Sequence, residues 1–252
     1  MPFSITISPS YADCSLLAAR AAIAILRQRL DQQQQVSLVL ATGVSQFGLL
    51  ENLVASSGIA WDRVTAFHLD EYAGLPESHP ASFRKYLVER FASQVPLRRF
   101  HTVQADAPDL LAECARLETL IRQAPVDLAL LGIGENGHLA FNDPPADFDT
   151  GRAYLVVDLD QACRQQQVGE GWFRSLQEVP TQAISMSIYQ IMQSRTIVCT
   201  VPDLRKAPAV RCALLGPVAP DCPASILRRH SDCQVFLDQD SASQVAPGLL
   251  LR

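Results

Sequence analysis

The amino-acid sequence predicts one α/β domain, built on an open and mostly parallel β-sheet with helices on both faces. Segments with a helical spacing of apolar residues alternate with short, nearly continuous apolar runs. Such runs are typical of strands that are buried on both faces, as in parallel sheets. A chain of 252 residues with 48% hydrophobic content can bury a substantial core and suits one domain of this class. We therefore expect residues 1–252 to form a single domain.

The first half of the chain alternates helical and strand patterns. Leu16, Leu17 and Leu30 belong to a helical spacing of apolar residues, which the side chain of Asp13 or Ser15 could cap. Apolar runs bounded by turn residues are typical of strands. The elements predicted here are a helix over about 12–33, a strand over 37–41, a helix over 47–54, a strand over 63–69, and helices over 82–91 and 108–122.

The second half continues this pattern around a longer polar stretch. An apolar run over 126–133 breaks into glycines, which is typical of a buried strand that ends in a tight loop. Residues 161–180 are polar and irregular, and such a segment could act as a mobile lid. The other predicted elements are strands over 154–159, 183–188, 196–201 and 233–237, and a helix over 206–215.

Polar side chains follow three of the predicted strands directly. The strand over 37–41 runs into a turn that contains Ser45, the next strand ends on Asp70, and the third is followed by a loop that contains His138. In open α/β sheets the ligand site lies at the carboxyl ends of the strands. We therefore expect Ser45, Asp70 and His138 to lie close together. The alternative for Asp70 is a solvated charge at a strand end, which is common.

The turn after the first strand has the features of an anion site. Thr42, Gly43 and Ser45 lie between a strand and the start of a helix, where free backbone N–H groups and the helix dipole favour a phosphate. The turn lacks the Gly-Lys-Ser/Thr ending of a P-loop and is not a Gly-x-Gly-x-x-Gly motif. The alternative is that Ser45 only caps the helix.

The loop over 132–143 carries groups that can move protons. Its glycines allow positive φ or a close approach of the backbone, so Asn136, His138 and Asp143 could point into one small volume. A histidine and a carboxylate held in this way can exchange protons near neutral pH. The alternative is a structural turn that carries a surface histidine.

Composition and charge exclude several classes of partner. The net charge of −5 and the lack of a long basic run give no sign of a nucleic-acid or membrane-surface partner. The sequence has no run of eighteen apolar residues and no secretory start, so we expect a cytoplasmic protein without a membrane span. Its seven cysteines include no Cys-x-x-Cys pair, so neither a disulfide framework nor a zinc site is indicated. The sequence leaves open whether the chain forms a homo-oligomer.

Several segments together resemble the glucosamine-6-phosphate deaminases (isomerases) and their relatives, the 6-phosphogluconolactonases. The likeness runs in order through most of the chain, and it is most specific around Asp70 and around Ala140-Phe141-Asn142. The segments that carry it are Leu40 to Ser45, Asp70 to Pro76 with His79-Pro80 and Ser82-Phe83, Gly132 to Pro144, Pro202 to Ala207, and Pro223 to Leu227. The resemblance implies a Rossmann-like fold and a small-molecule sugar phosphate as substrate.

The resemblance also implies a role for each matching residue. Asp70 would be the base that moves a proton between two neighbouring carbons, and His138, oriented by Asp143, would relay a proton during ring opening. Asn136 would support this relay by hydrogen bonding. The phosphate would be held by four residues: Thr42, Gly43, Ser45 and Lys206. No metal and no organic cofactor is implied.

The sequence departs from the family pattern at three points. Asn136 stands where the deaminases have Asp, and Asp143 stands where they have Glu, so the relay has one carboxylate fewer. The segment that carries a phosphate-binding arginine in the family has no clear match, which leaves Arg164, Arg174 and Arg228 as candidates. No basic residues match the allosteric site of hexameric relatives, so effector activation is not expected.

Two other functions remain as alternatives. A 6-phosphogluconolactonase would use His138 as its base, but lactonases usually continue Gly-His with Thr/Ala-Ser-Leu-Phe, unlike the residues after His138 here. A non-catalytic sugar-phosphate-binding protein is compatible with Asn136. The chain has no recognisable helix-turn-helix extension or basic face that would make it a DNA-binding regulator.

Overall fold

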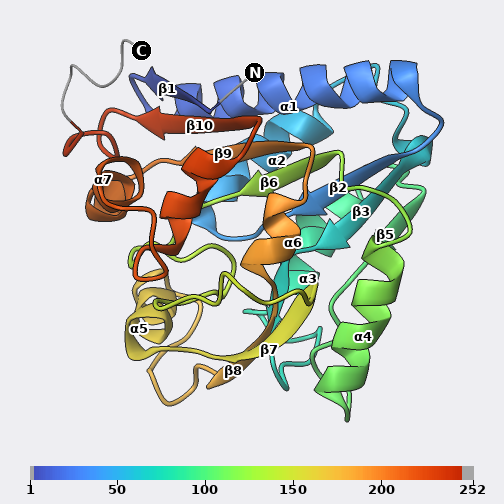
Figure 1. Ribbon diagram of the computed structural model, residues 1–252. Coiled ribbons are helices and arrows are strands. Elements are labelled where there is room, and N and C mark those ends of the chain that lie inside the picture. The colour runs from blue at the N-terminus through green and yellow to red at the C-terminus, as the bar shows by residue number, and fades with distance from the viewer. Residues whose placement is uncertain (1–2, 246–252) are drawn as a thin grey trace.

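The computed structural model describes residues 3–245, which form two β-sheets surrounded by helices (Figure 1). The larger sheet has seven strands in the order β1, β10, β9, β6, β2, β3, β5, and all neighbours in it are parallel. Its strands are β1 (Ser4–Ser8), β2 (Val36–Leu40), β3 (Val64–His68), β5 (Arg99–His101), β6 (Leu128–Leu131), β9 (Thr196–Val201) and β10 (Cys233–Asp238). The predicted open, mostly parallel sheet is confirmed.

The helices begin at polar capping residues in several places. The Ser10 hydroxyl accepts a hydrogen bond from the Asp13 N–H at the start of α1, so Ser10 is the cap and not Asp13 or Ser15 as predicted. The helices are α1 (Tyr11–Gln32), α2 (Phe47–Val54), α3 (Phe83–Leu87), α4 (Leu110–Ile121), α5 (Gln161–Gly169), α6 (Ile188–Met192) and α7 (Ala207–Leu215), with the short turns η1 (Val44–Gln46), η2 (Trp61–Arg63), η3 (Val88–Ala92), η4 (Leu204–Lys206) and η5 (Pro223–Arg229). Within residues 3–245, no helix has the length and apolar character needed to cross a membrane.

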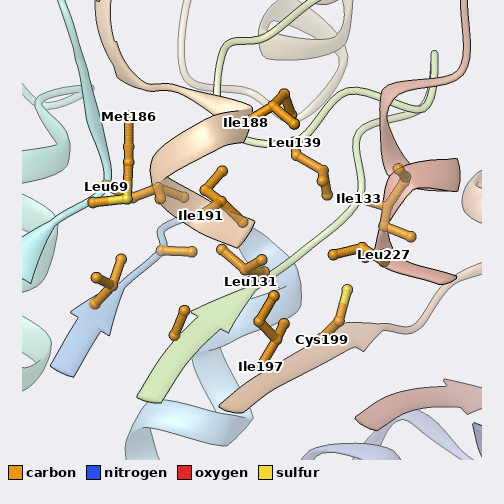
Figure 2. Close-up of a cluster of buried hydrophobic side chains, with 14 of the residues drawn as sticks. Leu69, Leu131, Ile133, Leu139, Met186, Ile188, Ile191, Ile197, Cys199 and Leu227 are labelled. Atoms are coloured by element: carbon orange, nitrogen blue, oxygen red, sulfur yellow. The ribbon is translucent and has the colours of Figure 1, made fainter. Parts of the chain in front are cut away.

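The two faces of the large sheet are buried under different helices (Figure 1). Leu128 and Leu130 of β6 pack with apolar residues of α1 and α2, whereas the alternate residues Ala129 and Leu131 pack on the opposite face with α4, α6 and α7. Figure 2 shows part of this second core, where Leu131 and Ile197 of neighbouring strands lie beside Ile191 of α6. Burial on both faces explains the nearly continuous apolar runs of these strands.

A second, three-stranded sheet is antiparallel and was not predicted. Its strands are β4 (Asp70–Tyr72), β8 (Gln182–Met186) and β7 (Tyr154–Asp158), in the order β4, β8, β7. The chain leaves the parallel sheet at Leu69, and Asp70 then pairs with Ser185 of β8. The partner strand lies more than 100 residues further along the chain, so the local pattern could not show this change of sheet.

The segment over 161–180 is partly helical, contrary to the prediction of an irregular stretch. The Asp160 carboxylate accepts a hydrogen bond from the Cys163 N–H, 2.5 Å away, and so caps α5. Cys163 and Gln167 are its buried residues, which leaves too few apolar positions for a helical pattern to stand out. The short elements β1, β5 and α6 were also missed, because each has only three to five residues.

We predict that Leu131→Ala lowers the free energy of unfolding by about 2–5 kcal/mol, because Leu131 is fully buried in the central strand β6. Leu111→Ala is the matched control, since the same atoms are removed from a side chain that is 68% exposed, and its effect should stay within about 0.5 kcal/mol. Urea unfolding followed by circular dichroism measures both. Equal losses for the two variants would contradict the assignment of Leu131 to the core.

Candidate active site

A cleft lies at the carboxyl edge of the large sheet, with an empty volume of ≈ 840 Å³ that includes space open to solvent. The loops after β2, β3 and β6 converge there as predicted, together with the turn after β9. Six of the eight predicted site residues line it: Thr42, Gly43, Ser45, Asp70, His138 and Lys206. Asn136 and Asp143 are not among the lining residues but contact His138 from behind.

The turn after β2 presents backbone N–H groups to the cleft. Gly43 has φ 97°, in the left-handed region that favours glycine, and the chain then enters η1 and α2. No side chain caps η1, so the first N–H groups of this helical segment can bind an anion, and Ser45 does not act as the cap. The Tyr86 hydroxyl donates to the Gly43 carbonyl at 3.1 Å, and the Tyr11 hydroxyl donates to the Val44 carbonyl at 2.9 Å. These two bonds hold the turn in place.

Lys206 enters the cleft from the opposite side, on η4. Its side chain is only 7% exposed, and burial lowers the pKa of its ammonium group, while the carboxylate of Glu170 acts in the opposite direction. The preceding Asp203 has φ 92°, an uncommon value for a residue with a side chain, and its N–H donates to the Asp238 carboxylate at 3.0 Å. Backbone strain of this kind is often found at functional sites.

Asp70 places a buried carboxylate at the floor of the cleft. It is 5% exposed, and its Oδ1 has no hydrogen-bond partner among the described residues. Burial, together with the charge of the adjacent Glu71, raises the pKa of Asp70 well above its usual range. A carboxylate without a partner and with a raised pKa is suited to accept a proton from a ligand.

The neighbouring carboxylate of Glu71 has a structural role. It accepts hydrogen bonds from the N–H groups of Phe83 and Arg84 and from the Ser82 hydroxyl, and its Oε2 lies 3.6 Å from Arg84 Nε. These contacts attach the start of α3 to β4. The two carboxylates at this strand end therefore differ, because one is free to face a ligand and the other is saturated.

His138 is packed directly against the backbone of its own loop. A Cβ atom at Gly134 would lie 2.2 Å from His138 Nε2, so only glycine allows the imidazole to occupy this position. The ring nitrogen Nδ1 lies 3.1 Å from Asp143 Oδ1, although the angle of a straight hydrogen bond is not met. Burial alone would raise the pKa of the Asp143 carboxyl, but the adjacent His138 ring and the hydrogen bonds from Asn136 and the Asp160 N–H hold it below its usual value. Asp143 is therefore ionised beside the imidazole.

Asn136 connects the histidine with two carboxylates. Its Oδ1 accepts the His138 N–H at 3.0 Å, and its Nδ2 donates to Asp143 Oδ1 at 3.1 Å and to Asp160 Oδ2 at 3.2 Å. The Asp160 N–H also donates to Asp143 Oδ2 at 3.0 Å. The sequence analysis missed Asp160, although an acidic residue before a helical segment could have marked it as a cap. The region thus keeps a second carboxylate despite the Asn at position 136.

The C-terminal part of α5 contributes residues to the cleft that the sequence analysis did not identify. Gln166, Gln167 and Glu170 line it, as does Arg205 on the other side. The three arginines considered earlier do not line it: Arg164 donates to the carbonyls of Leu176 and Val179, Arg228 donates to those of Leu214 and Gly216, and Arg174 is exposed. The local pattern gave no signal for Gln166, Gln167 and Glu170, because their place in the cleft depends on where the mostly polar helix α5 docks.

One group of side chains near the cleft has the composition of a metal site. Within the part of the chain that the structure describes, ligand atoms of His138, Asp143 and Cys163 lie within 4.8 Å of one another. Imidazole, carboxylate and thiolate groups are all ligands of zinc. However, the thiol must lose its proton to bind, and burial raises the pKa of Cys163. The absence of a required metal therefore stays a prediction.

Comparison with known proteins agrees with the resemblance seen in the sequence. The family model for glucosamine-6-phosphate isomerases/6-phosphogluconolactonase matches residues 10–236. Glucosamine-6-phosphate deaminases from an Exiguobacterium species and from Listeria monocytogenes are 38% and 35% identical to this chain. The alignments cover 93% and 90% of this chain and 91% and 95% of those proteins.

Solved structures give the same result. A monomeric glucosamine-6-phosphate deaminase superposes with a TM-score of 0.88 at 33% identity, over 96% of this chain and 99% of the other. A 6-phosphogluconolactonase from Thermotoga maritima superposes with a TM-score of 0.77 over 94% of this chain and 99% of the other, but at 18% identity, which shows a shared fold alone. The chain belongs to the family of glucosamine-6-phosphate isomerases and 6-phosphogluconolactonases.

Proposed function

We propose that this protein is a glucosamine-6-phosphate deaminase, which converts glucosamine 6-phosphate and water to fructose 6-phosphate and ammonia. The observation that carries the proposal is the free, buried carboxylate of Asp70, which shares one cleft with His138 and with an anion-binding turn. Two glucosamine-6-phosphate deaminases are 38% and 33% identical to this chain, whereas the 6-phosphogluconolactonase compared above is similar in fold alone.

Ring opening is the first step, and His138 serves it. The pyranose ring opens when the C1 hydroxyl loses a proton and the ring oxygen gains one. The imidazole lines the cleft and can relay this proton, while the ionised Asp143 behind it stabilises the imidazolium form. Asn136 helps to hold both residues in place, because its Oδ1 accepts the backbone N–H of His138 and its Nδ2 donates to Asp143.

Proton transfer between carbons is the second step, and Asp70 performs it. Its carboxylate removes the proton from C2 to give an enolamine and returns a proton to C1, which gives an imine at C2. Water hydrolyses this imine to the ketone and releases ammonia. Asp70 must be ionised to act, so its raised pKa puts the acid limb of the rate profile above the ordinary Asp value of 3.8.

The phosphate is bound away from the reacting carbons. Thr42, Gly43 and Ser45 line one side of its binding site, and Lys206 lines the other. Interactions with this remote group position C1 and C2 next to Asp70.

The most direct test of the function measures two products side by side. We expect ammonia and fructose 6-phosphate from glucosamine 6-phosphate, and no faster hydrolysis of 6-phosphogluconolactone than occurs without the protein. Unphosphorylated glucosamine should be a very poor substrate. Lactone hydrolysis without ammonia release would replace the proposal with the lactonase activity, and binding without turnover would indicate a sugar-phosphate-binding protein.

We predict that Asp70→Asn abolishes exchange of the C2 proton with deuterated solvent and leaves the fold intact. The amide has the same shape but cannot accept the proton, and no hydrogen bond of Oδ1 is lost. Nuclear magnetic resonance of the sugar in D₂O measures the exchange rate. Asp149→Asn, a substitution of the same kind at an exposed site, is the control. Exchange at the wild-type rate in Asp70→Asn would show that Asp70 is not the base.

We predict that Asp143→Asn reduces kcat/KM more than Asn136→Ala does. Asp143 supplies the charge that stabilises the imidazolium form of His138, whereas Asn136 supplies hydrogen bonds alone. The expected loss for Asp143→Asn is about tenfold or more, roughly 1.4 kcal/mol of transition-state stabilisation. Rates of both variants from pH 5 to pH 9 test this. If Asn136→Ala is inactive while Asp143→Asn keeps the wild-type rate, the orienting role belongs to Asn136.

A further inference from the structure

Glu170 places a fixed carboxylate at the phosphate end of the cleft. It follows α5 directly, its side chain is 6% exposed, and its Oε1 lies 3.9 Å from Lys206 Nζ. Gln166 Nε2 donates to Oε1 at 2.7 Å, and Trp172 Nε1 donates to Oε2 at 3.2 Å. Each carboxylate oxygen thus has a neutral donor that sets its position, and the 3.9 Å separation is too long for a hydrogen bond from Lys206.

The charges around this end of the cleft do not favour a dianion. Arg205 lies 2.7 Å from the Asp203 carboxylate and 3.6 Å from that of Glu135, so its charge is already compensated. Lys206 is the second cation that lines the cleft, and Glu170 offsets its charge. A phosphate with two negative charges would therefore meet a buried carboxylate that is held in place, and water cannot screen the repulsion well there.

We propose that Glu170 makes this site selective for the singly protonated phosphate monoester, whose P–OH group donates a hydrogen bond to the Glu170 carboxylate. Such an O–H···O⁻ bond is short and strong, and it turns the repulsion into a favourable contact. The inference rests on the proposed function, because it assigns the sugar phosphate to this end of the cleft. A sulfate ester has the same single charge as the phosphate monoanion but no O–H, so Glu170 also excludes it.

Other ionisable side chains near Glu170 could also make anion binding depend on pH. They are Lys206, Arg205, Tyr72 and Tyr86. Burial raises the pKa of both tyrosines, so they stay neutral below pH 8, and Arg205 stays charged. Lys206, whose pKa is lowered by burial, is the group that could also weaken anion binding as the pH rises. A sulfate ester has no titration between pH 5 and 8, so the pH dependence of its affinity reports the protein's own groups, which include Lys206, Asp70 and His138 in the same cleft.

The test compares glucitol 6-phosphate with glucitol 6-sulfate, two open-chain ligands that the enzyme cannot deaminate. Isothermal titration calorimetry from pH 5.5 to 8 gives their Kd values. Because the second pKa of a phosphate monoester is about 6, the affinity of the wild type for the phosphate should fall by up to about tenfold per pH unit above pH 6.5. The wild type should bind the sulfate at least about tenfold more weakly than the phosphate at pH 5.5.

Glu170→Gln should remove both effects, because the amide can donate to an unprotonated oxygen. Its phosphate affinity, measured relative to the sulfate, should not fall with pH, and its sulfate affinity should rise at least about tenfold. Glu178→Gln changes the same charge at an exposed position eight residues away and should behave like the wild type. If Glu170→Gln fails to fold, the affinities of the wild type for the two ligands still test the proposal.

The outcomes separate this inference from the proposed function. Equal wild-type affinity for both esters at pH 5.5, or phosphate affinity that rises towards pH 8, would overturn the role of Glu170 while leaving a phosphate site. No binding of glucitol 6-phosphate at any pH would instead overturn the phosphate site itself, and with it the proposed function.

Discussion

The candidate site depends on the parallel pairing of β6 with β2 on one side and with β9 on the other. Leu128 lies opposite Leu38 of β2, and Leu131 lies opposite Cys199 of β9. Parallel neighbours end at the same edge of the sheet. The turn after β2, the loop after β6 that carries His138 and the turn after β9 that carries Lys206 therefore leave the sheet side by side. Asp70 reaches this edge differently, since the chain turns after β3 into the antiparallel sheet, where β8 holds Asp70 in register. A slip of any of these strands would separate the groups that now line one cleft.

Buried charges at this edge are balanced locally and to different degrees. Glu71 accepts hydrogen bonds from Ser82, Phe83 and Arg84 that oppose the rise in its pKa caused by burial, and the neighbours of Asp143 hold its pKa below the usual value. Asp70 has no such partner for Oδ1, and Lys206 faces a carboxylate without a hydrogen bond to it. Of these four charged side chains, Asp70 and Lys206 line the cleft, whereas Glu71 and Asp143 do not. This is the distribution expected of a site that a polar ligand completes, because unpaired buried charge costs stability until the ligand binds.

The sequence was most informative where the pattern is local. Continuous apolar strands with polar residues at their ends predicted both the parallel sheet and the meeting of Ser45, Asp70 and His138 at one edge. It was least informative where structure depends on distant partners. The antiparallel pairing of β4 with β8 and the short edge strands carry little local signal. The orientation of Glu170 towards Lys206 also depends on where a mostly polar helix docks, and no periodicity could show that.

The central claim is that the carboxyl ends of these strands form one site in which Asp70 faces the sugar carbons while the turn after β2 and Lys206 hold the phosphate. A crystal structure with an open-chain amino alditol 6-phosphate tests this claim most directly, because the ligand mimics the opened substrate but has no carbonyl to react. The account predicts that the phosphate lies between Ser45 and Lys206 and that C1 and C2 lie next to the Asp70 carboxylate. A ligand bound in the reverse direction, or outside this cleft, would contradict it.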